Sequence, residues 1–541
     1  MKYLLSTFLS LAVSISTIAQ TSNPGADYLA LGEKKLAKDY FTKTVGQNPA
    51  EANYYLGEIA FQEGNASEAK SFYEKGLAAD ALNPFNAIGL AKLELKSNPK
   101  AAEDQLSEIQ KKNKKDISVV LAIAKAYSEN GMVEKASAKI EDARKINKKS
   151  PLVYILEGEI LEKNGKAGEA AMQYDQAINF DPNFTLAYVK GAKVYETINP
   201  TTAIDMLKKV ISIQPDYLLA YKYLGKIYST NGFFPEAVAA YKTYFAKGNY
   251  TVEDIRYYAG DEYYLKNYDA VKGLVKEGLA LDPNNFVLNR LLMYSANETK
   301  DFATAQAAAE KFFSLPREKD VNYIPQDYMA YANILSELGQ KAQAIEQYKN
   351  AIALDPSKIE LNKEIATICG NENMDAEAAE FYKKYIELAG DKVEAADYFQ
   401  LGRYYYTAGT AAAKDSLQKA QAPELFKEAN TAFAVVSERI PDSYMGYLWS
   451  ARANASLDPE TTEGLAKPYY EKTIEVILAK NDGENTRELI EAYRYLSYYY
   501  YLQFDATKSA EAKEKTKINS EKLLELDPEN SIGKQLLEVV K

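Results

Sequence analysis

Small and large apolar residues recur at fixed distances ahead of proline. Before Pro182 stand Gly158, Leu161, Ala170, Tyr174 and Ala177, and before Pro356 stand Ala332, Leu335, Ala344, Tyr348 and Ala351, in each case 24, 21, 12, 8 and 5 residues from the proline. Large residues one turn apart predict helices with one apolar side. Proline ends the second helix or opens the next. We therefore predict pairs of antiparallel helices, in which a small residue of the first faces a small residue twelve positions later.

The same pattern recurs along the chain. Its matches are Tyr221, Leu224, Gly225, Tyr228, Ala237 and Tyr241; Ile365, Ala366, Cys369, Ala378 and Tyr382; Ala124, Tyr127, Ala136 and Ile140; Leu56, Gly57, Ala69 and Tyr73; and, more weakly, Ile88, Gly89 and Ala101, and Ala192, Tyr195, Ala203 and Leu207. One helix pair cannot bury its apolar face alone, so neighbouring pairs must stack. An array of repeats is the predicted architecture.

These residues resemble the tetratricopeptide repeat, whose pattern is W/Y-x2-L-G/A-x2-Y, then A-x3-F/Y-x2-A, then P, over 34 residues. The resemblance covers nearly the whole chain after residue 20. It implies an all-α, right-handed superhelical solenoid of about 13–14 helix-turn-helix units. It also implies that the first helix of each unit lines a concave groove, and that the groove binds protein.

Departures from the repeat divide the chain. We expect a signal peptide over residues 1–20, an N-terminal array over 21–314, a phase break over 315–325, a C-terminal array over 326–528 and a capping helix over 529–541. The two units across residues 252–314 are degenerate. An insertion rich in Ala, Lys and Gln lies near residues 407–422, where a solvated loop is expected.

The composition argues against catalysis. Among 541 residues there is no histidine, and Cys369 is the only cysteine. This removes Ser/His and Cys/His catalytic pairs and the usual zinc ligand sets. A carboxylate, tyrosine or lysine site remains possible in principle. We expect no enzyme, cofactor or metal, and no nucleic-acid partner for a chain of net charge −11.

The first residues resemble a signal peptide. Lys2 precedes an apolar stretch without charges, and Thr17 and Ala19 are small residues ahead of a cleavage site before Gln20. After residue 20 no apolar run approaches the roughly 20 residues that span a bilayer. We expect an exported protein of the periplasm or cell surface. The Lys-, Asn- and Tyr-rich composition is similar to that of secreted repeat proteins of Bacteroidota.

Arginine is concentrated at expected groove positions. In this family the second, fifth, ninth and twelfth positions of the first helix line the groove. The candidates for partner binding at or beside these positions are Lys193, Lys222, Lys226, Arg256, Arg290, Lys363, Phe399, Arg403, Tyr406, Arg452, Arg494, Tyr498 and Tyr501. Arginine grips carboxylates with two parallel bonds, so an acidic protein or peptide is the expected partner. Alternatively, these cations pair with Glu and Asp of adjacent units.

Two functions fit this reading. The first is a non-enzymatic scaffold or adaptor of the cell envelope that binds an extended peptide or partner domain in the groove. The second is a chaperone-like holdase or assembly factor for exported or outer-membrane clients. Stoichiometric binding of one partner favours the scaffold, whereas suppressed aggregation of many clients favours the holdase.

Overall fold

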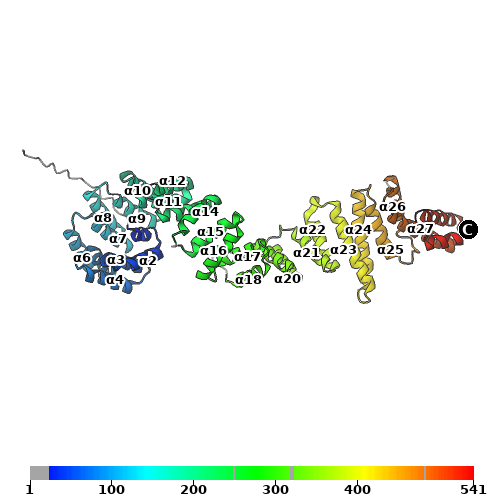
Figure 1. Ribbon diagram of the computed structural model, residues 1–541, viewed down its shortest axis with the longest axis horizontal. Helices are drawn as coiled ribbons and strands as arrows, with labels where there is room; N and C mark the ends of the chain where they lie inside the picture. The colour runs from blue at the N-terminus through cyan, green and yellow to red at the C-terminus, as the bar shows by residue number, and fades with distance from the viewer. Residues whose placement is uncertain (1–22, 248–249, 317–321, 481–482) are drawn as a thin grey trace, which may run out of the picture. The chain divides into compact units, whose positions relative to one another are not determined.

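The chain is built of helices throughout its described length. The computed structural model describes residues 23–247, 250–316, 322–480 and 483–541. In these ranges it contains 29 α-helices, two short 3-10 helices and no strand (Figure 1). The prediction of an all-α solenoid of helix pairs is confirmed: α1 to α28 make fourteen successive pairs, and α29 follows alone. The expected signal peptide, residues 1–20, lies outside the described residues.

The chain divides into two compact units, residues 1–291 (unit 1) and 292–541 (unit 2). The division falls inside α17 (Phe286–Glu298). The helices of unit 1 before it are α1 (Pro24–Ala30), α2 (Lys34–Thr44), α3 (Pro49–Gln62), α4 (Ala66–Ala79), α5 (Pro84–Glu94), α6 (Pro99–Lys112), α7 (Ile117–Glu129), α8 (Val133–Ile146), α9 (Pro151–Lys163), α10 (Ala167–Phe180), α11 (Thr185–Ile198), α12 (Pro200–Ile213), α13 (Leu218–Thr230), α14 (Phe234–Phe245), α15 (Val252–Tyr264) and α16 (Tyr268–Leu281).

Unit 2 continues the same alternation. Its helices after α17 are α18 (Phe302–Ser314), α19 (Pro325–Glu337), α20 (Lys341–Leu354), α21 (Leu361–Asn371), α22 (Asp375–Ala389), α23 (Ala395–Lys414), α24 (Ala422–Arg439), α25 (Tyr444–Leu457), α26 (Lys467–Lys480), α27 (Thr486–Thr507), α28 (Ala510–Leu526) and α29 (Ser531–Val539). The expected phase break over 315–325 falls partly on residues 317–321, outside the described residues, and stays a prediction. The degenerate stretch 252–314 forms the regular pairs α15/α16 and α17/α18.

Small residues of the first helices make room for rings of the second helices. A Cβ on Gly158 of α9 would lie 2.5 Å from the Tyr174 ring of α10, and a Cβ on Gly57 would lie 2.4 Å from the Tyr73 ring. Both rings are fully buried. The side chain nearest to each glycine therefore lies sixteen positions later, one turn beyond the small residue that the sequence pattern places opposite it. The aromatic ring needs more room than an alanine does.

The insertion near residues 407–422 lengthens helices instead of forming only a loop. The helix α23 runs for 20 residues to Lys414 and α24 for 18 residues. Ala408 and Ala412 are buried on the added turns, and Phe426 packs beside Ala412 and Ala422. Because alanine favours helix and small faces allow close packing, the extra residues extend the pair. Only the connection near Leu417 is exposed as expected.

The C-terminal helix α29 packs against α27 and α28. Leu536 on its inner side is buried. The helix α29 therefore covers part of the pair α27/α28. None of the helices in the described part of the chain is long and apolar enough to cross a membrane.

Candidate functional site

Unit 2 contains a pocket lined by first helices of three successive pairs. It has a volume of about 440 Å³, and its lining residues are Tyr406 of α23; Arg452, Ala455 and Ser456 of α25; Tyr470 of α26; Glu491, Arg494, Tyr495 and Tyr498 of α27; and Ile532 of α29. Four of the thirteen predicted residues, Tyr406, Arg452, Arg494 and Tyr498, are among them. The repeat brings them together because corresponding positions of neighbouring first helices stack side by side.

Arg452 is held inside this pocket by its own chain. Its Nε and Nη2 donate to the two carboxylate oxygens of Glu491 at 2.9 and 2.7 Å. The guanidinium lies 4.9 Å from the centre of the Trp449 ring, and the Tyr470 hydroxyl donates to the same carboxylate at 3.0 Å. The bond to Glu491 raises the pKa of Arg452. Arg452 therefore makes a bidentate ion pair with a carboxylate of the adjacent repeat, which was the alternative to partner binding in the sequence analysis.

Arg494 and Tyr498 present unengaged groups in the same pocket. Both are exposed, Tyr498 to 42% of its surface. Within the described residues no hydrogen bond or ion pair holds the Arg494 guanidinium. The Tyr501 ring lies 6.5 Å from that of Tyr498 and is half-buried. In such an arrangement the guanidinium can bind a carboxylate of a ligand, and the aromatic rings can pack against the apolar part of the same ligand.

An aromatic cluster supports the pocket from behind. The Trp449 ring is in edge contact with Tyr406 at 5.4 Å and with Phe399 at 5.8 Å between ring centres. Phe399 also packs on the buried Phe433. Phe399 is therefore part of the packing beneath the pocket and is not one of its lining residues.

The remaining candidates in unit 2 lie outside the pocket. Arg403 on α23 is exposed and lowers the pKa of Asp375, which burial raises. Lys363 on α21 donates to Asp397 at 2.8 Å and lies 4.7 Å from the centre of the Tyr385 ring. Lys363 already has a partner in the chain, whereas Arg403 points to solvent.

The candidates in unit 1 are bound within the chain. Lys193 donates to the Leu31 carbonyl at 2.6 Å, and Lys226 pairs with Glu196 at 3.2 Å. The Lys222 ammonium lies 2.8 Å from Glu33 and 3.3 Å from Asp254. Arg256 lies on α15 and is half-buried. In α17, where the two units divide, the Arg290 guanidinium lies 5.1 Å from the Phe286 ring centre.

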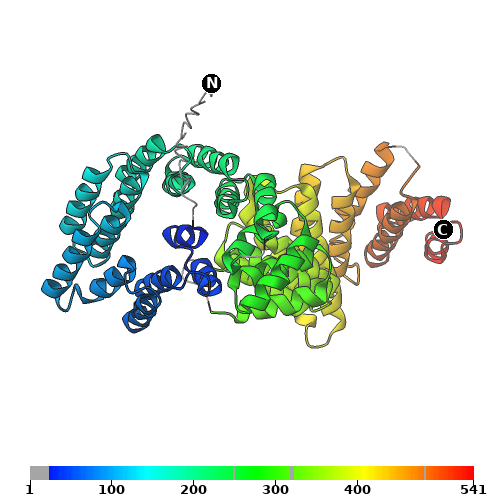
Figure 2. The same ribbon diagram turned by 60° about the vertical axis from the view of Figure 1, so that its left-hand side comes forward.

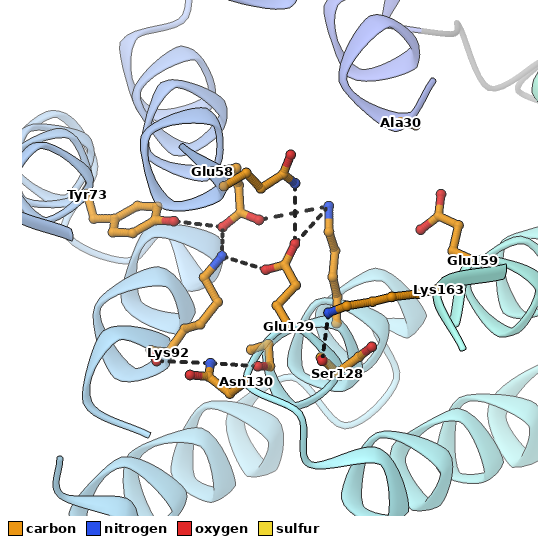
Figure 3. Close-up of polar contacts among 12 residues, drawn as sticks. Ala30, Glu58, Tyr73, Lys92, Ser128, Glu129, Asn130, Glu159 and Lys163 are labelled. Carbon is orange, nitrogen blue, oxygen red and sulfur yellow. Dashed lines mark hydrogen bonds and ion pairs between the residues drawn. The ribbon is translucent and has the colours of Figure 1, made fainter. Parts of the chain in front are cut away.

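Unit 1 also buries an ionic network that the sequence analysis missed (Figure 3). The Lys92 ammonium on α5 donates to Glu58 of α3 at 2.6 Å and to Glu129 of α7 at 2.8 Å. The Tyr73 hydroxyl donates to Glu58 at 2.8 Å. The Lys92 side chain is only 2% exposed. The available signal was Glu58, directly after the repeat residue Gly57, and Lys92, three positions after the repeat residue Gly89, where the pattern has an aromatic residue.

A cavity of about 610 Å³ lies beside this network. It is lined by α1, α3, α5, α7, α9 and α11, with apolar residues such as Tyr54, Leu121 and Ile155 and carboxylates such as Glu51 and Glu159. In the described part of the chain no three His, Cys, Asp or Glu side chains could hold a metal ion. Burial raises the pKa of the Cys369 thiol, which disfavours the reactive thiolate.

Known proteins show the same repeat. Family models of the tetratricopeptide repeat match residues 25–84 and residues 328–358. Both stretches are tetratricopeptide repeats. The matched stretches cover most of the pairs α1/α2 and α3/α4 and most of the pair α19/α20. No curated protein matches the chain in sequence.

Several solved structures are similar to this chain. The C-terminal part of a repeat protein of Cytophaga hutchinsonii has 28% identity and a TM-score of 0.34, covering 52% of this chain and 99% of that one. A repeat protein of Parabacteroides merdae has 18% identity and a TM-score of 0.31, covering 47% and 98%. PilF of Pseudomonas aeruginosa has 14% identity and a TM-score of 0.30, covering 45% and 96%.

Proposed function

We propose that this chain is a non-enzymatic scaffold or adaptor of the cell envelope. The repeat itself is a protein-interaction fold. The observation that supports a binding role here is the unit 2 pocket, in which Arg494 and Tyr498 are exposed beside the Arg452–Glu491 pair. Export rests on the apolar segment at residues 3–19 and the small residues Thr17 and Ala19 at its end.

The chemistry of the pocket favours an acidic, extended protein segment. The Arg494 guanidinium offers up to five donors to a carboxylate, while the Tyr498 and Tyr406 rings offer apolar contact. Glu491 is already neutralised by Arg452, so it does not repel an incoming carboxylate. A volume of about 440 Å³ holds one or two side chains of a bound segment.

Contact at this pocket is tested by photo-crosslinking. A photoreactive phenylalanine replaces Tyr498 in the pocket, and in a control chain it replaces Ile518, which is 47% exposed on α28 and outside the pocket. After irradiation in a native envelope extract, we expect a discrete protein adduct at position 498 that is absent at 518. Equal adduct patterns at both positions would overturn the proposed site.

The holdase remains the competing function. It predicts that the protein suppresses aggregation of several unrelated unfolded clients at near-stoichiometric amounts. The scaffold predicts one adduct partner and no such suppression. A light-scattering assay with two chemically unrelated clients separates the two functions.

A further inference from the structure

The first helix of unit 1 packs against helices far along the chain. Lys190 on α11 donates to the Ala30 carbonyl of α1 at 2.7 Å, across 160 residues of sequence. The Tyr217 hydroxyl, just before α13, donates to Asp27 of α1 at 3.1 Å. In Figure 2 the dark-blue first helix lies beside the teal helices of this region. The first repeat therefore lies against the sixth and seventh repeats of its own array.

The polar contacts converge on the C-terminal end of α1 and the turn after it. Lys193 donates to the Leu31 carbonyl at 2.6 Å. The Tyr223 hydroxyl and the Lys222 ammonium donate to the two oxygens of Glu33 at 2.9 and 2.8 Å. The carbonyls at a helix C-terminus carry partial negative charge and lack partners within the helix. Lys190 and Lys193 thus bind carbonyls at the C-terminal end of α1, and Lys222 binds the Glu33 carboxylate.

Apolar burial accompanies these bonds. Leu31 is 3% exposed and belongs to one hydrophobic cluster with Tyr217, Tyr223 and Leu224. Tyr28 and Ala30 pack against the same cluster. The segment 24–33 fills a surface formed by first helices, and these are the helices that line the groove in this repeat family.

We propose that the face formed by Lys190, Lys193, Lys222 and Tyr223 is a binding surface for the acidic C-terminal end of a partner protein's helix, and that residues 24–33 occupy it as an intramolecular ligand. Segment 24–33 is here called the latch. Release of the latch opens the face, and a partner segment of the same chemistry takes its place. The partner's essential features are free helix-end carbonyls, a following apolar residue and a Glu two residues later.

The charge of the face defines this partner. Lys190 and Lys222 are 7% and 13% exposed, and burial together with the neighbouring Lys190 lowers the pKa of Lys193. Three lysines this close require acceptors when covered. Two carboxylates neutralise part of this charge: Glu159 lies 2.8 Å from Lys190, and Asp254 lies 3.3 Å from Lys222. The latch supplies the rest, through the Ala30 and Leu31 carbonyls and the Glu33 carboxylate, so a segment with Lys at the position of Glu33 would place a cation against Lys222.

This proposal explains two of the candidate lysines of unit 1, Lys193 and Lys222, and it adds to the proposed scaffold function without depending on the Arg494 pocket. Its experiment uses variants of unit 1 only. A failure here leaves the Tyr498 crosslink unaffected, and failure of that crosslink leaves the latch experiment interpretable.

The test opens the latch by charge reversal in the full chain. Glu33→Lys places a cation against Lys222, whereas the control Asp39→Lys makes the same charge change on the exposed side of α2. The probe is a fluorescein-labelled synthetic peptide with the sequence of residues 23–34. We expect Glu33→Lys to bind this peptide at least tenfold more tightly than the wild type or Asp39→Lys. A peptide carrying Lys in place of its Glu is expected not to bind.

Hydrogen–deuterium exchange reports the latch directly. Amides of residues 24–33 are expected to exchange at least tenfold faster in Glu33→Lys than in the wild type, with unchanged exchange in α7 and α9. Unchanged exchange in the latch overturns the proposal. So does faster exchange without preference for the acidic peptide over its charge-reversed form.

If Glu33→Lys does not fold, the proposal is tested with two variants that each remove a single hydroxyl group. Tyr223→Phe removes the hydroxyl that bonds Glu33, and Tyr221→Phe removes a hydroxyl on the same helix that bonds the Pro215 carbonyl at an exposed position. Latch exchange is expected to accelerate at least twofold in Tyr223→Phe and not in Tyr221→Phe. Equal exchange in both variants overturns the proposal.

Discussion

The charged side chains at the expected groove positions differ in whether they already form ion pairs within the chain. Lys222 and Arg452 sit at expected groove positions, yet each is bound to carboxylates of the same chain. Arg494 sits at an equivalent position and is exposed. The sequence predicted all three as candidates but could not separate them, because the partners Glu33 and Glu491 lie 189 and 39 residues away.

The close contact between Gly158 and the Tyr174 ring gives the first residue-scale prediction. Gly158→Ala places a Cβ at 2.5 Å from that ring, and we expect a loss of about 1–3 kcal/mol in unfolding free energy. Gly273→Ala, in α16 with nothing within 4 Å, should instead gain roughly 0.5–1 kcal/mol. Denaturant unfolding followed by circular dichroism measures both. A loss no larger for Gly158→Ala than for Gly273→Ala would show that the ring moves freely.

Asp27 gives a pH-dependent prediction. Burial raises its pKa to about 6, from a usual value of 3.8. Between these values the folded chain keeps a proton that the unfolded chain has lost, so stability falls as pH rises from about 4 to 6. Asp27→Asn removes this dependence and retains an acceptor for the Tyr217 hydroxyl. We expect it to raise stability at pH 7 by up to about 3 kcal/mol.

The measurement for Asp27 is the melting temperature at pH 4.5 and pH 7. The variant should melt higher than the wild type at pH 7, and its advantage at pH 4.5 should be about a third as large. An equal difference at both pH values would contradict the raised pKa.

Helix pairs are the elements that the sequence predicts well. Proline, small residues and large residues at fixed offsets placed even the degenerate stretch 252–314 in regular pairs. The prediction of a loop at 407–422 was wrong. The repeat pattern gives no length for helices that run past the usual unit, so it did not show that this alanine-rich stretch extends α23 and α24. The latch contacts could not be predicted at all, since the repeat pattern describes neighbours in sequence and carries no information on contacts across 160 residues.

The buried network of unit 1 ties three first helices together. Lys92→Met leaves Glu58 and Glu129 facing each other without their shared cation. We expect a loss of about 3–5 kcal/mol in unfolding free energy, because removing one partner of a buried ion pair is costly and the two carboxylates would then share only Lys125, 3.8 Å from Glu58 and 4.0 Å from Glu129. Lys70→Met breaks an exposed pair with Glu74, with side chains 64% and 57% exposed, and should cost less than about 1 kcal/mol.

Chemical denaturation of the two lysine variants measures this difference. A comparable loss in both would mean that the network contributes no more than a surface pair. Full stability of Lys92→Met would mean that Lys125, 3.8 Å from Glu58, replaces the missing charge.

At the scale of the whole molecule, the same type of repeat binds a segment of its own chain in unit 1 and leaves an exposed pocket in unit 2. In unit 1 the inner helices are neutralised by the chain's own carboxylates and by the latch. In unit 2 the pocket at α25 and α27 keeps one guanidinium exposed. Each unit is a continuous stack of helix pairs, so a partner can extend over several repeats while one or two charged contacts select it.

The central claim is that the Arg494 pocket captures an acidic protein segment. The most direct measurement is quantitative affinity capture from a native envelope extract with wild type, Arg494→Glu and Lys517→Glu chains in parallel. Lys517 is exposed on α28, outside the pocket, so its variant matches the charge change. We predict that one protein recovered with wild type and Lys517→Glu falls at least tenfold with Arg494→Glu, at unchanged helical content. Equal recovery with all three chains would contradict the account.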